Sequence, residues 1–87
     1  MSVVWDKETE NKFNQLIEKI PSAMQSFARG KISKKAESLV IDDGRNEIKE
    51  KDMVDAFFAE TPFGFHGPMK TDMETVGIDY AQYGHSR

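Results

Sequence analysis

The sequence contains no cysteine among its 87 residues. This absence excludes disulfide bonds, zinc sites built on thiolates, cysteine-ligated iron–sulfur clusters and a cysteine nucleophile. No apolar run approaches the ~20 residues that a membrane-spanning helix needs, and the residues at the start do not resemble a signal peptide. We therefore expect a cytoplasmic protein that does not use a membrane as a partner.

The chain also lacks a strong excess of charge of either sign, with 12 basic and 15 acidic side chains and a net charge of −3. Binding to nucleic acid through release of counterions needs a larger positive field, so we do not expect a nucleic-acid partner. Gly-x-Ser-x-Gly elbows, P-loops and dinucleotide fingerprints are absent. The sequence thus favours a non-catalytic protein without a cofactor.

The composition differs between two parts of the chain. Residues 61–87 hold four of the six glycines, two of the three prolines, both histidines and both tyrosines. Residues 1–60 hold the single tryptophan and almost all the aliphatic side chains. We predict a helical domain over residues 1–60, followed by a tail over residues 61–87 that is extended or disordered.

The first predicted helix begins at Asp6, a residue type that caps helices well. An apolar stripe with helical spacing follows, and Pro21 ends the helix because the residue before a proline avoids the α conformation. Trp5 lies just before the cap, where it can fold back onto Phe13 or onto the next helix. The stripe consists of Phe13, Leu16, Ile17 and Ile20.

The second predicted helix runs from about Ser22 to Val40 and includes Gly30. A glycine in the middle of a helix costs about 1 kcal/mol relative to alanine, so Gly30 either kinks the helix or lets another element approach closely. The residues predicted for the apolar side of this helix are Met24, Phe27, Ala28, Ile32, Ala36, Leu39 and Val40.

Ile48 is predicted to make a short extended contact before a third helix over residues 49–59. Met53, Val54, Phe57 and Phe58 form the core face of that helix. The predicted fold is all-α, a small orthogonal three-helix bundle with an irregular C-terminal arm. Its helix–loop–helix order over residues 32–59 is partly like that of a histone fold.

The order of several motifs resembles a known family over roughly residues 3–60. These motifs are Trp5, Ile20-Pro21, the segment 27–32 (FARGKI) and the segment 48–54 (IKEKDMV). They resemble the small helical C-terminal domain of the B subunit of light-independent protochlorophyllide reductase, which also occurs as a free-standing protein. The resemblance implies a helical module accessory to a larger redox enzyme, whose iron–sulfur cluster and electron-transfer machinery lie in other parts of the complex.

A positive cluster on the second predicted helix is one candidate binding site. It consists of Arg29, Lys31, Lys34 and Lys35, four basic residues within seven positions. Such a cluster can hold a phosphate, a tetrapyrrole propionate or an acidic patch on a partner protein, or it can be a solvated helix face. We predict partner or anion contact at Arg29, Lys31 and Lys35.

Aromatic side chains in the tail are the second candidate site, with predicted partner contacts at Phe63, Phe65 and His66. Disordered tails are usually poor in aromatic residues. The tail is therefore a strap that packs back over the helices, an arm that becomes ordered on a larger complex, or a plainly disordered segment. His66 and His85, with nearby carboxylates, are also candidate metal ligands, but their wide spacing favours incidental histidines.

Taken together, these features predict a non-catalytic accessory or interaction module of a larger, redox enzyme complex. Two alternatives stay open. One is a small domain that binds a tetrapyrrole or another anionic cofactor, and the other is a protein with a metal-binding tail.

Overall fold

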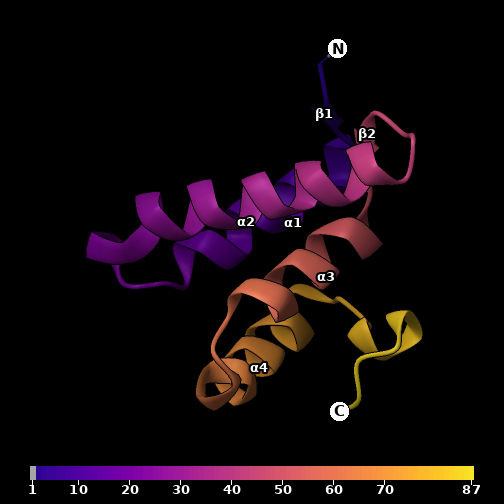
Figure 1. Cartoon of the computed structure of the whole chain (residues 1–87). Coiled ribbons are helices and arrows are strands. Elements are labelled where there is room, and N and C mark those ends of the chain that lie inside the picture. Colours follow the sequence, from indigo (N-terminus) through magenta and orange to yellow (C-terminus); the bar gives the residue numbers. More distant parts are fainter. Residues whose placement is uncertain (1) are drawn as a thin grey trace.

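A computed structural model describes residues 2–87 and shows four helices joined by short connections (Figure 1). Helices α1 and α2 lie side by side, and α3 and α4 lie beneath them in the view of Figure 1. The helices are α1 (Lys7–Glu18), α2 (Ser22–Asp42), α3 (Glu50–Glu60) and α4 (His66–Val76), with short 3₁₀ helices η1 (Phe63–Phe65) and η2 (Tyr80–Tyr83). The expected helical fold class is confirmed at this level, but the number of helices is not.

Helix α1 starts at the predicted cap. The Asp6 carboxylate accepts hydrogen bonds from the Thr9 amide at 3.1 Å and the Thr9 hydroxyl at 2.8 Å. These hydrogen bonds, with that from Lys49, keep the pKa of Asp6 below its ordinary value. Trp5 stacks on Phe13 with 4.6 Å between the ring centroids, which confirms that Trp5 folds back onto the first helix.

Two very short strands join the beginning of the chain to the loop before α3. Strand β1 (Val4–Trp5) pairs in parallel with β2 (Glu47–Ile48), so that Trp5 lies opposite Ile48. The extended contact predicted at Ile48 is therefore this strand. Ile48 is completely buried, and the pairing fixes where α3 begins relative to α1.

The tail predicted to be irregular contains the fourth helix, α4, so the prediction of an irregular arm was wrong for residues 66–76. Glycine and proline do not prevent this helix because Gly67 and Pro68 occupy its first turn. The amide groups of the first turn have no partner inside the helix, so a proline there loses no hydrogen bond. The helix ends at Gly77, whose φ of 88° is favourable only for glycine.

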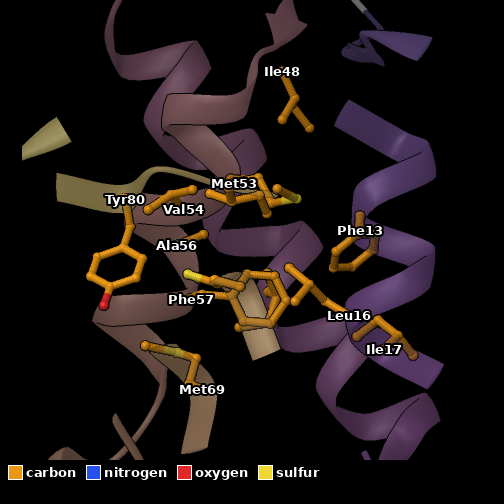
Figure 2. Packing of buried hydrophobic residues seen from close by; sticks show 14 of the residues in the cluster. Phe13, Leu16, Ile17, Ile48, Met53, Val54, Ala56, Phe57, Met69 and Tyr80 are labelled. Atoms are coloured by element: carbon orange, nitrogen blue, oxygen red, sulfur yellow. The ribbon is translucent and has the colours of Figure 1, made fainter. Parts of the chain in front are cut away.

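The core forms around α3, which packs against α2 and α1. Figure 2 shows Met53 and Phe57 of α3 pointing toward Phe13 and Leu16 of α1. Residues from the C-terminal third complete this core, since Met69, Met73, Ile78 and Tyr80 are all buried. Of the three alternatives for the tail, the structure agrees with a strap that packs back over the helices.

Side-chain hydrogen bonds hold the end of that strap. The Tyr83 hydroxyl donates to the Glu50 carboxylate at 2.9 Å, and the same carboxylate pairs with Lys12 at 2.6 Å. Burial and the neighbouring Glu50 carboxylate raise the pKa of Tyr83 to about 12. The last turn of the chain is thus tied to the start of α3 and to α1.

Candidate functional site

An apolar groove of about 550 Å³ lies between two helical corners. One side is the α1–α2 corner around Ile20 and Pro21, and the other is the α3–α4 connection around Pro62 and Phe65. The lining includes core residues such as Leu16, Ile32, Phe57 and Met69. The groove is therefore an opening into the hydrophobic core itself.

Large apolar side chains on both sides of the groove are exposed to solvent. Phe27 of α2 is 66% exposed, Met24 of the same helix is 53% exposed, and Phe65 on the opposite side is 64% exposed. Aromatic and methionine side chains are enriched where proteins contact one another. These three residues give the groove an apolar border that the described residues 2–87 leave uncovered.

Met24 and Phe27 belong to the predicted apolar side of the second helix but lie outside the core, for a geometrical reason. At 1.5 Å per residue, the 21 residues of α2 extend over ~31 Å, whereas the 11 residues of α3 extend over only ~16 Å. Helix α3 covers the part of α2 that carries Ile32, Ala36 and Val40, which are buried. The N-terminal turns of α2 project beyond that contact, so their apolar side chains meet solvent at the groove.

The charged residues of the groove are divided by sign between its two sides. Lys19 and Lys31 lie on the α1–α2 side, and Glu60 and Asp72 lie on the α3–α4 side. Lys31 Nζ is 3.9 Å from Glu60 Oε1 and 5.6 Å from the centre of the Phe27 ring. One ion pair thus connects the two sides.

Only two of the six predicted contact residues, Lys31 and Phe65, line the groove. Phe63 lies close by in η1 and is 88% exposed. Arg29 points instead toward α1, where its guanidinium donates to Asn14 Oδ1 at 2.9 Å and lies over the Phe13 ring. Lys35 is half-buried one turn farther along α2 and does not line the groove, so the structure does not bring the three predicted basic contacts together there.

The two histidines contact the same ring, that of Phe58. His66 meets the Phe58 ring edge-on, with its Nε2 hydrogen-bonded to the Thr61 carbonyl at 2.8 Å. The His85 ring stacks on Phe58 with 4.0 Å between centroids, and its Nε2 lies 2.7 Å from Asp55 Oδ1. Both histidine side chains therefore help to hold the C-terminal strap (residues 61–87) against α3. Within residues 2–87, no three histidine or carboxylate side chains are grouped so that they could hold a metal ion.

A second, shallow hollow of about 320 Å³ is lined mainly by aspartates near the end of α2 and the start of α3. Three of its four aspartates already have partners, and the first is Asp43, which pairs with Arg45 at 2.7 Å. Asp52 bonds to both terminal nitrogens of Arg45, and Asp55 pairs with Lys51 and His85. These three aspartates of the hollow therefore pair with neighbouring basic side chains and stabilise the fold, and nothing in their arrangement indicates a ligand.

Sequence reasoning missed most of the groove residues, among them Ile20, Pro21, Met24 and Phe27 on one side and Pro62 and Pro68 on the other. A signal for some of them was available. The second helix was predicted to be longer than the first and much longer than the third, and a helix that long has turns that a short bundle cannot cover. The predicted length alone does not show which end of the second helix projects beyond its neighbours.

Comparisons with known proteins correct the resemblance to the protochlorophyllide reductase domain. No curated protein and no solved structure matches the chain. None of the helices within residues 2–87 combines the length and apolar character needed to cross a membrane. A family described as a protein of unknown function, DUF2621, matches residues 1–86, and the chain belongs to this family.

Proposed function

We propose that this chain is a non-catalytic interaction module that binds an apolar helix of another protein in the groove between the α1–α2 and α3–α4 corners. The observation that supports the proposal is the exposure of Met24, Phe27 and Phe65 around an opening into the core. Protein-binding sites commonly place such anchors around a hydrophobic hollow. The redox enzyme expected as host depended on the corrected resemblance, so we do not include it.

The shape of the groove favours a protein helix over a small molecule. A pocket for a small molecule normally buries 70–90% of its ligand, with most of its apolar side chains turned inward. Here the Phe27 and Phe65 rings stand about two-thirds exposed on opposite sides. A helix whose apolar residues recur at i, i+3 or i+4, and i+7 can cover both rings while it inserts side chains between them.

The chemistry of the lining supports a binding role without catalysis. The residues that line the groove include no serine, histidine or cysteine. Apart from one threonine, the polar lining consists of two lysines and two carboxylates, and Lys31 already pairs with Glu60. These side chains can orient a bound helix, and the apolar surface supplies its affinity.

A displayed library of helical peptides tests this proposal. We expect the full chain to select peptides with an apolar stripe, and Phe27→Asp or Phe65→Asp to weaken binding about tenfold or more, which corresponds to about 1.4 kcal/mol. Ile41→Asp is the matched control because Ile41 is 58% exposed on the same helix but does not line the groove. Equal loss in Ile41→Asp, or selection of peptides without an apolar stripe, would contradict the proposal.

A second candidate function is the binding of a small amphiphilic anion such as a tetrapyrrole carboxylate. The groove volume of about 550 Å³ falls within the range of ligand pockets, ~300–1,000 Å³, and Lys19 and Lys31 can meet a carboxylate. Titration with protoporphyrin, followed by its absorption spectrum, tests it. This candidate predicts a saturable spectral change that a Lys19→Ala/Lys31→Ala variant reduces. A spectrum that does not change excludes it.

A further inference from the structure

The two sides of the groove carry opposite charges, and this arrangement suits one particular partner. Lys31 and Glu60 pair with each other across the groove. Lys19 at the end of α1 and Asp72 on α4 lie on opposite sides, and no ion pair is found for either within the described residues 2–87. One positive and one negative side chain therefore face the same groove with no charged partner.

We propose that the protein helix bound in the groove belongs to a second copy of this chain, and that the two copies are related by a two-fold axis parallel to the groove. This inference rests on the proposed function and specifies its partner. In a two-fold interface, the same surface of both copies is buried, so that surface must be complementary to itself. The groove meets this requirement in both charge and shape.

The charge pattern selects the direction of the axis. A two-fold axis along the groove places the basic side of one copy opposite the acidic side of the other, so Lys19 faces the second copy's Asp72 twice. An axis across the groove would instead place lysine opposite lysine and carboxylate opposite carboxylate, which is unfavourable. The net charge of −3 is small, so the long-range repulsion between two copies is weak.

The apolar surface is also self-complementary because each copy has both a hollow and projecting side chains. Met24 and Phe27 stand on the exposed N-terminal turns of α2, beside the opening to Leu16 and Phe57. Face to face, the α2 turns of each copy cover the opening of the other. This contact would bury the exposed rings and close the core of both copies.

Sedimentation equilibrium on charge-reversed variants tests the arrangement. The wild type is expected to dimerise, and Lys19→Glu or Asp72→Lys alone to weaken dimerisation about tenfold because each variant creates two like-charge contacts. A mixture of the two single variants is expected to form a heterodimer. In that heterodimer, the carboxylate introduced in one copy faces the amine introduced in the other, and the unchanged Lys19 and Asp72 face each other. A mixture that stays as monomeric as its components overturns the proposed axis.

Apolar variants complete the test. Phe27→Asp is expected to be monomeric and Ile41→Asp dimeric, with circular dichroism showing that both variants fold. A dimer that persists in Phe27→Asp places the contact elsewhere and overturns the inference. A monomeric wild type also overturns it. If that monomer still binds the selected helical peptides in the groove, the failure is confined to the second copy and the interaction function stands.

Discussion

At the scale of single residues, the start of α3 depends on one buried carboxylate. Asp52 is 5% exposed and accepts the Lys49 amide at 2.8 Å and the Arg45 guanidinium at 2.7 and 3.1 Å. Burial raises the pKa of Asp52, but the hydrogen bonds from Arg45 and Lys49 outweigh it, so the pKa lies below its ordinary value of 3.8. The sequence shows an acidic residue near a helix start, but not the arginine that folds over it.

This carboxylate predicts loss of stability in acid. The unfolded chain binds a proton at Asp52 more readily than the folded chain, so the stabilisation is present above the ordinary pKa and is lost as the pH falls below it. Asp52→Asn should lower the free energy of unfolding by about 2 kcal/mol near neutrality and flatten its acid dependence. Urea denaturation between about pH 6 and pH 3 measures both effects. An acid dependence as steep in the variant as in the wild type would contradict this assignment.

Substitution of glycine by alanine should change the free energy of unfolding in opposite directions at Gly30 and Gly77. Gly30 lies inside α2, and a Cβ added there meets no atom of the described chain within 4 Å. Gly30→Ala should therefore raise the free energy of unfolding by about 1 kcal/mol. Gly77 has a φ of 88°, so Gly77→Ala should lower it by about 1 kcal/mol. Thermal melting of both variants checks the pair, and a destabilised Gly30→Ala would show that α2 needs the glycine.

At the scale of elements, the sequence predicted the helices that have clear start signals and apolar spacing. Asp6 and Pro21 bound α1 as expected, and Ile48 precedes α3 in an extended strand. Helix α4 was missed because composition alone does not show that Gly67 and Pro68 occupy a first turn. Its buried residues, Met69 and Met73, are too few to give a strong apolar pattern.

The C-terminal third should be required for folding, since four of its side chains lie in the core. Ending the chain after Glu60 removes Met69, Met73, Ile78 and Tyr80 and exposes the surface of α3 beneath them. We expect this shortened chain to lose cooperative thermal unfolding, and Met73→Ala in the full chain to lose about 3 kcal/mol. Circular dichroism during heating measures both.

A shortened control separates loss of the core from loss of chain length. Ending the chain after His85 removes two exposed residues, of which Arg87 pairs with Asp79 at the surface, and keeps the contacts of His85 and Tyr83. Exposed ion pairs contribute little to stability. This control should melt close to the full chain. Cooperative unfolding of the chain that ends at Glu60 would show that residues 61–87 are dispensable for the fold.

At the scale of the whole molecule, the fold leaves one side of its core uncovered. A small domain has little apolar surface to bury, and here α3 does not cover the turns of α2 on which Met24 and Phe27 stand exposed. Lys31 and Phe65 were identified from residue type alone. The remaining groove residues depend on how the α1–α2 and α3–α4 corners face each other, which local sequence patterns do not specify.

Binding of another protein chain in the groove should change the surroundings of the backbone amides that line it. The most direct test records ¹H–¹⁵N spectra of the full-length protein with and without a selected helical peptide and maps the shifted amides on the structure. Binding in the groove predicts shifts around Ile20, Phe27, Thr61 and Met69, and little change around Asp42 and Asp43 at the other end of α2. Shifts that cluster around those aspartates and leave the groove unchanged would contradict it.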